Sequence, residues 1–484
     1  MDMLRLRTAV GAAVLALCAS LFQGAGQAEA VTVTVTNGTR FADTAGNPLH
    51  AHGGGVIKVG AYYYWFGENR NADNSFRYVS AYRSTDLKTW EFRRHVLTQA
   101  TDPELAGANI ERPKVMYNAG TGQFVMWMHK EGSATDYSEA RAAVAVSSTV
   151  DGDYSWRGSF RPLGAMSRDI TTYVDDDGTG YMVSAANENR DLHVYRLTAD
   201  YTGIDAQVQS LWNGESREAP ALFKRNGVYF LLTSGASGWA PNQQKYATAG
   251  SITGTWSGLR DAGDGVTYAS QTAFVLPVAG SQGTSYLYLG DRWGNSTGGT
   301  VNDSQYVWLP LAFPTDTTLT LGYSPQITVN AAAGRIAPLK ATWQQLVGRQ
   351  SGKCVDVGDY SFGESARLLQ WTCGNGANQN FFLKNLGTGY VQVMARHSGK
   401  CLDIEGGSTA DGALAVQGTC ADVPSQQWQV QRVADGSGNV RLIARHSGKC
   451  LDVVNQATTD GAALEQWACN NGANQQFGRR TVTV

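Results

Sequence analysis

Four polar residues stand at the beginnings of hydrophobic, strand-like segments that recur about every 50 residues. They are Glu111, Asp169, Glu218 and Gln271. Two carboxyl groups held at one place can divide acid and base work, one protonating a leaving group and the other activating water. These residues are therefore candidates for an acid–base site, provided that the fold brings them together.

The segments around these residues predict a β-propeller. Each polar residue precedes a hydrophobic run, a turn and an aromatic-rich strand, as in Val228–Thr233. A repeat of this length made only of short strands is typical of a propeller blade. A similar pattern begins at His50–Ile57, so we expect five blades. Because the first strand of each blade lines the central channel, the four residues are expected to converge on one pocket.

The first 30 residues predict secretion. Arg5 and Arg7 precede the apolar run 9–22, and Ala28-Glu29-Ala30 provides a small-x-small cleavage site. A membrane anchor is the alternative, but the apolar run is short for a bilayer. The net charge of −2 gives no sign of a nucleic-acid partner. We expect a secreted, extracellular monomer without a membrane segment.

Six cysteines in the last third fall into three pairs with equal spacing: Cys354 and Cys373, Cys401 and Cys420, Cys450 and Cys469. Equal spacing within repeats favours three local disulfides, whereas a zinc site would need close ligand pairs. The segment Ser351–Asp356 recurs as Ser398–Asp403 and Ser447–Asp452, and three such repeats predict a β-trefoil. The predicted organisation is all-β: a signal peptide at 1–30, a five-bladed β-propeller at 31–336 and a β-trefoil at 337–484, with 330–334 as the linker.

The C-terminal repeats resemble the ricin-B-type lectin trefoils, also called carbohydrate-binding module family 13. The resemblance implies a sugar site in a repeat, with an aromatic ring stacked on the sugar and an Asp and an Asn bonding its hydroxyls. It assigns a first site to Asp356, Trp371, Asn378 and Gln379, and a third site to Asp452, Trp467, Asn474 and Gln475. In the middle repeat Gly418 replaces the ring and Ser425 the Asn, so Asp403 is expected to be structural there. Core packing is the alternative for the three Gln residues of this motif.

The N-terminal segments Leu49–Gly54, Ile110–Lys114, Ser167–Asp169 and Arg217–Pro220 resemble glycoside hydrolase family 43. They are closer still to its subfamily 24, the exo-β-1,3-galactanases. The resemblance implies the release of galactose from the non-reducing end of β-1,3-galactan, the backbone of arabinogalactan, with inversion. The alternatives are an α-L-arabinofuranosidase or β-xylosidase on the same scaffold, and a non-catalytic two-domain lectin.

Glu218 is the expected general acid, because its apolar neighbours keep a carboxyl group protonated. Asp169 is expected to raise the pKa of Glu218 and to orient it. The family's usual base, an Asp at the start of blade one, is absent from Gly53–Gly55, and the resemblance gives this role to Gln271. A neutral amide is a poor base, so Gln271 acts through its imidic tautomer or orients the water. Glu111 is the other candidate base; otherwise it binds galactose hydroxyls or forms an ion pair in the channel.

Further residues are expected to bind substrate: Glu68, Arg112, Tyr137, Asn187 and Trp293. Each is equally compatible with packing or turn structure. His50, His52 and His129 suggest a metal site, but His-x-His lacks a fixed third partner, so no metal is expected. Hydrolysis by two side chains needs no cofactor. The expected partners are the β-1,3-galactan chain and galactose-type sugars at the trefoil.

Overall fold

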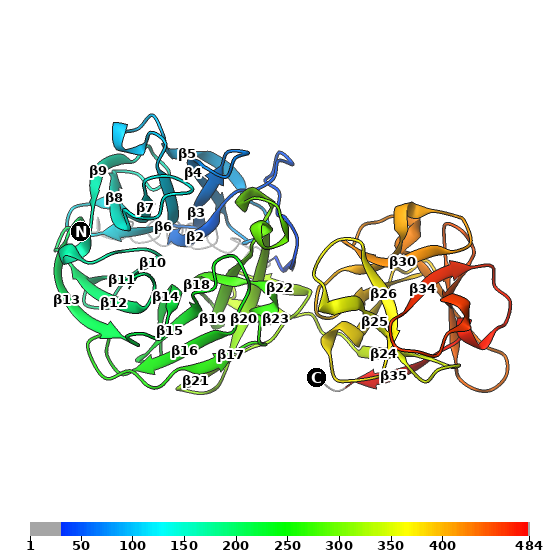
Figure 1. The fold of residues 1–484 in the computed structure, drawn as a ribbon. Coiled ribbons are helices and arrows are strands. Elements are labelled where there is room, and N and C mark those ends of the chain that lie inside the picture. Colours follow the sequence, from blue (N-terminus) through cyan, green and yellow to red (C-terminus); the bar gives the residue numbers. More distant parts are fainter. Residues whose placement is uncertain (1–30, 483–484) are drawn as a thin grey trace, which may run out of the picture.

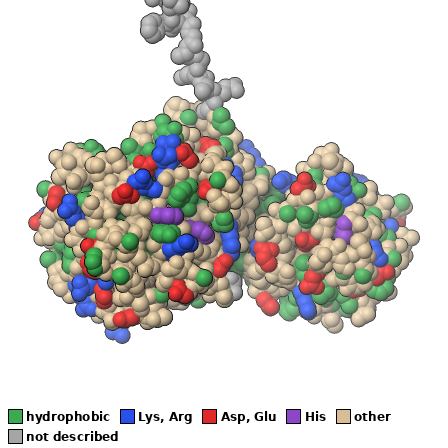
Figure 2. Space-filling view, turned by 90° about the horizontal axis from the view of Figure 1, so that it is seen from above, with side chains coloured by type: hydrophobic (Ala, Val, Ile, Leu, Met, Phe, Trp, Pro, Cys, Tyr) green, Lys and Arg blue, Asp and Glu red, His purple; other side chains and the backbone are tan. Residues whose placement is uncertain are grey.

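The computed structural model describes residues 31–482, so the predicted signal peptide lies outside the described residues. The described chain is built almost entirely of strands and forms two domains that lie side by side (Figure 1). Figure 2 shows two lobes that meet at a narrow waist, with charges of both signs interspersed over this face. Among residues 31–482 no helix is long and apolar enough to cross a membrane.

Five four-stranded antiparallel sheets follow one another along the N-terminal domain. The first two are β2 (His52–Val59), β3 (Tyr62–Arg70), β4 (Phe76–Ser84) and β5 (Glu91–Thr98), then β6 (Asn109–Asn118), β7 (Gln123–Glu131), β8 (Arg141–Ser147) and β9 (Ser155–Phe160). The next two are β10 (Ile170–Val174), β11 (Gly180–Ala186), β12 (Asp191–Leu197) and β13 (Ile204–Leu211), then β14 (Arg217–Arg225), β15 (Val228–Gly235), β16 (Gln244–Ala249) and β17 (Arg260–Ala262). The fifth is β18 (Gln271–Gly280), β19 (Gly283–Arg292), β20 (Gln305–Thr315) and β21 (Thr318–Leu321). The first strand of each sheet contacts the first strand of the next, and β18 returns to β2, so these strands surround a common centre.

A sixth sheet joins the two ends of the domain. It has three strands, β1 (Val33–Thr36), β22 (Gln326–Asn330) and β23 (Arg335–Pro338). The prediction of five blades is therefore wrong: counted by its sheets, the propeller has six. The error arose because β1 has no neighbour in sequence and pairs with β22 from the far end of the domain. The predicted linker at 330–334 forms the turn between β22 and β23 instead.

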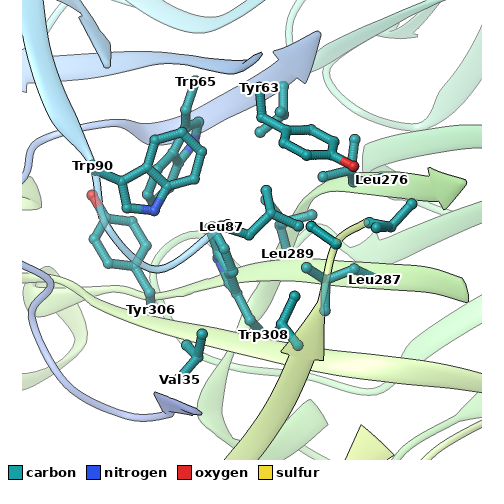
Figure 3. Packing of buried hydrophobic residues seen from close by; sticks show 14 of the residues in the cluster. Val35, Tyr63, Trp65, Leu87, Trp90, Leu276, Leu287, Leu289, Tyr306 and Trp308 are labelled. Atoms are coloured by element: carbon teal, nitrogen blue, oxygen red, sulfur yellow. The ribbon is translucent and has the colours of Figure 1, made fainter. Parts of the chain in front are cut away.

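An aromatic cluster packs the first, fifth and sixth sheets against one another (Figure 3). Trp65 of β3 lies 5.2 Å from Trp90 and 4.9 Å from Trp308 of β20, measured between ring centroids. Val35 of β1 packs on the same cluster, and all of these side chains are buried. Rings of this size each bury roughly 150–250 Å² of surface. The cluster therefore closes the ring of sheets by apolar burial.

Twelve strands form the C-terminal β-trefoil, four in each repeat. They are β24 (Trp343–Gly348), β25 (Cys354–Val357), β26 (Ala366–Trp371), β27 (Phe381–Asn385), β28 (Val391–Ala395), β29 (Cys401–Ile404), β30 (Ala413–Gly418), β31 (Trp428–Arg432), β32 (Val440–Ala444), β33 (Cys450–Val453), β34 (Ala462–Trp467) and β35 (Phe477–Val482). The predicted trefoil and its three disulfides are confirmed, each disulfide joining cysteines 19 residues apart. A single apolar core that includes Trp428 fills the centre of the domain.

Short 3₁₀ helices complete the connections. Three of them take the same place in the three trefoil repeats: η7 (Ala377–Gln379), η9 (Pro424–Gln426) and η11 (Ala473–Gln475). The others are η1 (Pro103–Leu105), η2 (Pro162–Gly164), η3 (Thr267–Ala269), η4 (Gly294–Thr297), η5 (Val301–Asp303), η6 (Gly358–Tyr360), η8 (Glu405–Gly407) and η10 (Val454–Gln456).

Gly54 on β2 lies against the neighbouring backbone, which leads to a stability prediction. A Cβ atom at this position would lie 1.6 Å from the carbonyl oxygen of Phe66, so the strands would have to move apart. We expect Gly54→Ala to lower the free energy of unfolding by about 3 kcal/mol or more. Denaturant titration followed by tryptophan fluorescence measures this change. The control is Gly322→Ala, where a Cβ atom meets nothing within 4 Å; equal stability of the two variants would contradict the prediction.

Candidate active site

The inner strands surround a pocket of about 250 Å³. All four predicted acid–base candidates line it, together with four of the five predicted substrate-binding residues: Glu68, Arg112, Tyr137 and Trp293. The fifth, Asn187, is not among the lining residues; its exposed side chain donates to Asp191. The first residues of inner strands that are far apart in the sequence thus meet around one pocket.

Bulges at the beginnings of the inner strands turn side chains into this pocket. The strand register shifts directly after four residues: His52, Glu111, Glu218 and Thr272. Arg112 and Ala219, each next to a pocket carboxylate, have φ values of +51° and +50°. Residues other than glycine rarely adopt this left-handed conformation, and such strain is concentrated at functional sites. A bulge re-aims the side chain beside it, which explains how strand residues point along the channel.

Glu218 is buried and held at both carboxyl oxygens. Its Oε1 accepts a hydrogen bond from Gln271 Nε2 at 2.9 Å, and its Oε2 accepts one from Asn189 Nδ2 at 3.0 Å. Burial, followed by the negative charge of Asp169, raises the pKa of Glu218 to about 8. Asp169 is fixed nearby, since its Oδ2 accepts a bond from the Ala219 amide. At neutral pH Glu218 therefore carries a proton that it can donate.

Arg112 connects the walls of the pocket. Its guanidinium contacts Asp169 Oδ1 at 2.8 Å through Nε and donates to Gln271 Oε1 at 2.6 Å through Nη2. Its backbone amide donates to Glu68 Oε1 at 2.8 Å. Because the side chain is buried, these bonds form in a low-dielectric setting where charged hydrogen bonds are strong. Arg112 therefore fixes the three groups relative to one another.

All hydrogen-bonding positions of the Gln271 amide are occupied. Its Nε2 donates to Glu218 and to Ser234 Oγ, both at 2.9 Å. Its Oε1 accepts from Arg112 and from Trp293 Nε1, at 2.6 and 2.8 Å. This pattern assigns the amide oxygen and nitrogen without ambiguity, because two donors face the oxygen. The amide is held in one orientation.

Glu111 belongs to a second cluster of charged side chains in the pocket. Its Oε1 is 3.1 Å from Arg70 Nη2 of β3 and accepts a bond from Tyr137. His129 Nδ1 lies 3.0 Å from Glu111 Oε2, and its Nε2 lies 2.8 Å from Glu131. Burial opposes the charges, but His129 and Arg70 hold the pKa of Glu111 well below its usual range. Glu111 is thus an ionised carboxylate paired with a cation from a neighbouring blade.

A metal ion fits this cluster poorly. Ligand atoms of Glu111, His129 and Asp169 lie within 4.8 Å of one another, and His50 and His52 are not part of the group. Burial lowers the pKa of His129, but its bonds to Glu111 and Glu131 outweigh burial and raise the pKa to about 9. A metal ion would have to displace the His129 proton and both carboxylate partners of the imidazole, because only a neutral imidazole ligates a metal. The three groups act as ion-pair partners.

Glycines in β2 leave space for two charged side chains. A Cβ atom on Gly53 would lie 2.5 Å from Glu68 Oε1, and one on Gly55 would lie 2.8 Å from the Lys114 side chain. Lys114 Nζ donates to the Gly53 carbonyl at 2.6 Å. Burial and the charge of Arg112 lower the pKa of Lys114 to about 7. The missing blade-one carboxylate is therefore replaced in space by Glu68, which comes from β3.

Sequence reasoning missed several residues of the pocket, and Asn189 and Trp239 are the two that bear on its chemistry. Asn189 binds Glu218, whereas the predicted residue was Asn187 two positions earlier. Both stand in the turn between β11 and β12, and only the turn geometry decides which one faces the pocket. Trp239 lines the mouth, is 37% exposed and packs edge-on against Trp293 with a centroid distance of 5.3 Å. Its loop, 236–243, carries no strand pattern that places it at the channel.

The first and third trefoil repeats contain matching polar groups beside an exposed ring. Asp356 accepts bonds from Asn378 and Gln379 at 2.9 and 2.8 Å, and Asp452 accepts bonds from Asn474 and Gln475, both at 2.8 Å. The rings of these repeats, Trp371 and Trp467, are 47% and 42% exposed. Gln379 and Gln475 are buried and also bond to backbone groups, so they brace each Asp from inside the domain.

The middle repeat keeps the hydrogen bond between Gln and Asp but lacks the exposed aromatic ring. Gln426 donates to Asp403 Oδ2 at 2.9 Å, as its counterparts do in the other repeats. Gly418 stands where the ring would be, and the Asp403 carboxylate lies 3.2 Å from the position of its missing Cβ atom. Asp403 also bonds to the Ile404 amide. This repeat offers no aromatic face for a sugar.

Two protein families match the chain. Residues 50–262 match glycosyl hydrolases family 43, and residues 342–477 match the ricin-type β-trefoil lectin domain. An exo-β-1,3-galactanase structure from Clostridium thermocellum is 47% identical, covers 93% of this chain and all of its own, and has a TM-score of 0.65. An exo-β-1,3-galactanase from Phanerochaete chrysosporium, solved with β-1,3-galactotriose, is 29% identical, covers 93% of this chain and 94% of its own, and has a TM-score of 0.62. Comparison with curated protein sequences gives no match.

Proposed function

Because the chain belongs to glycosyl hydrolases family 43 and carries a ricin-type β-trefoil lectin domain, we propose that it is a secreted exo-β-1,3-galactanase. It removes galactose from the non-reducing end of β-1,3-galactan by inverting hydrolysis. The observation that carries this proposal is the buried, protonated Glu218 held by Gln271 in the propeller pocket beside Asp169. The three disulfides support an oxidising, extracellular setting.

The size of the pocket supports action at a chain end. Its volume of about 250 Å³ is below the 300–1,000 Å³ typical of sites for larger ligands. One terminal sugar therefore fills the inner part, and the rest of the chain leaves over the rim of the mouth, where Trp239 and Trp293 are in contact. Glu111, Glu68 and Tyr137 line the inner wall, where they can bond the hydroxyl groups of that sugar.

Glu218 acts as the general acid and protonates the glycosidic oxygen of the leaving chain. Asp169 keeps the proton on Glu218 before reaction by charge repulsion, and Arg112 holds Asp169 in place. When the proton has left, the positive charge of Arg112 stabilises the new Glu218 carboxylate. Burial and the charge of Asp169 thus raise the pKa of the acid, and Arg112 partly offsets them.

We assign Gln271 to orienting the attacking water, which on substrate binding replaces one of the four protein partners of the amide. Its imidic tautomer would place a hydroxyl proton on Oε1, facing the N–H groups of Arg112 and Trp293. That tautomer would also leave only one proton on Nε2, which donates two bonds here. The bonding pattern therefore favours the ordinary amide. The proton of the water passes to a pocket carboxylate, for which we propose Glu68: burial raises its pKa, whereas the cations beside Glu111 make that carboxylate the weaker base.

Hydrolysis of β-1,3-galactan tests the proposed function. We expect the protein to release galactose, with the inverted anomer appearing first in proton NMR spectra. Glu218→Gln removes the proton donor and is expected to lower kcat/KM by about 10²–10⁴. Glu215→Gln, the same change at an exposed nearby site, is the control and retains full activity. Release of arabinose or xylose instead would favour another glycosidase, and no release from any glycan would favour a lectin.

The pKa of Glu218 predicts how activity depends on pH. Since the acid must be protonated, kcat/KM is expected to fall as the pH rises through about 8. Asp169→Asn removes the repulsion that raises this pKa, so the fall should move to lower pH. Asp176→Asn, an exposed turn residue, is the control and leaves the profile in place. A profile of the Asp169 variant that falls at the wild-type pH would refute the coupling of the two carboxyl groups.

The trefoil is expected to bind galactose-type sugars at its first and third repeats. Trp371→Ala and Trp467→Ala should each weaken binding at their own site about tenfold, because the stacking face is lost. Isothermal titration with galactose measures this, and Val423→Ala, another exposed apolar residue of the trefoil, is the control. Binding by the double variant at wild-type strength would show that the sugar sites lie elsewhere.

A further inference from the structure

A groove of about 880 Å³ lies between the two domains, where the lobes of Figure 2 meet. The propeller contributes one wall, which includes Pro241, Arg292 and Trp293, and the trefoil contributes the other, which includes Phe362, Glu364 and Thr419. The groove is therefore a property of the whole chain, and neither domain has it alone.

The groove adjoins the catalytic pocket. A hollow of about 10 Å³, too small to hold a sugar, lies between them and shares Trp239 and Gln271 with the pocket and Pro241 and Ser296 with the groove, so a bound chain passes over its rim. Trp293 lines the pocket, the hollow and the groove. Its indole nitrogen holds Gln271, so the ring that borders the groove is anchored at the catalytic centre. A chain that leaves the pocket past Trp239 enters the groove.

The walls of the groove have the mixed chemistry of a sugar-binding surface. Phe362 from the trefoil stacks on the guanidinium of Arg292 from the propeller, 4.7 Å from its ring centroid. Ion pairs border the groove on both sides: Asp303 with Arg40 on the propeller, and Glu364 with Lys400 on the trefoil. Aromatic faces suit the apolar faces of pyranose rings, and carboxylates and cations bond hydroxyl groups.

The far end of the groove coincides with the altered trefoil repeat. Lys400 pairs with Glu364 in the middle repeat, just as Lys353 pairs with Asp460 and Lys449 with Asp411 in the others. In those two repeats the ion pair stands beside an exposed tryptophan ring. Here the corresponding position is Gly418, next to the groove residue Thr419. A ring at this position would stand beside the groove wall, and its absence leaves the end of the groove open.

We propose that the interdomain groove binds the galactan chain on the reducing-end side of the bond that is cleaved, from the mouth of the pocket to the middle trefoil repeat. This proposal rests on the proposed exo-galactanase function. The middle repeat serves here as a wall for a bound chain, in place of a separate site for a terminal sugar. Long chains then gain contacts that a disaccharide cannot reach.

Filling the groove tests this proposal. Gly363 lines the groove, and a Cβ atom there meets only the Ser361 hydroxyl at 3.3 Å, so Gly363→Trp adds a ring to the open space. Thr388→Trp adds the same ring at an exposed trefoil position away from the groove and is the control. For each protein, kcat/KM is measured on β-1,3-galactobiose and on a β-1,3-galactan oligosaccharide of six or more sugars.

We expect Gly363→Trp to lower kcat/KM on the long oligosaccharide about tenfold and to leave the value on the disaccharide unchanged, whereas Thr388→Trp changes neither. Equal values of the two variants on the long substrate would overturn the proposal, as would an equal loss on both substrates. Circular dichroism and the midpoint of thermal unfolding report whether each variant is folded; if Gly363→Trp does not fold, Ser296→Trp on the opposite wall replaces it. An unmodified protein that cleaves neither substrate would refute the proposed function itself, an outcome distinct from a groove without effect.

Discussion

One buried guanidinium holds the catalytic pocket together. Arg112 comes from β6, and its bonds reach Glu68 on β3, Asp169 before β10 and Gln271 on β18. Groups from three other sheets are therefore fixed by one residue, Glu68 through its backbone amide and the other two through its guanidinium, and the backbone of this residue is in the left-handed region. Leaving buried carboxylates without such a partner is strongly unfavourable. The fixed orientation of the Gln271 amide and the position of the Asp169 charge, which together with burial raises the pKa of Glu218, both depend on this arrangement.

The glycines of β2 are explained by the charged side chains that lie against them, and these side chains also bear on the mechanism. Without side chains at Gly53 and Gly55, the Glu68 carboxylate and the Lys114 ammonium occupy the start of the first sheet. An aspartate at position 53 would collide with Glu68. The pocket thus contains a carboxylate at this place, but it comes from the second strand of the sheet and is tied to Arg70. The sequence lacks the family's usual aspartate at this position, but the site still contains a carboxylate there.

The periodicity of the sequence predicted the features that depend on short, regularly repeated segments. Glu218 and Gln271 could be identified because each begins a repeat, and the cysteine spacing gave the disulfides directly. The sixth sheet could not be predicted, since β1 and β22 are short and find each other only in three dimensions. The choice of Asn189 over Asn187, and the approach of Trp239 to the pocket, depend on turn and loop conformations that follow no period. Residues at the beginnings of strands were thus predictable, whereas of the loop residues Tyr137 and Trp293 were found and Asn189 and Trp239 were not.

The pairing of β1 with β22 has a consequence for how the protein is made. Partners such as Val35 and Ile327 are about 300 residues apart, so the earliest strand to leave the ribosome stays unpaired until almost the whole catalytic domain has been synthesised. Closing so long a loop is slow, and the ring of sheets remains open meanwhile. The contact between β1 and β22 is therefore among the last of the domain to form.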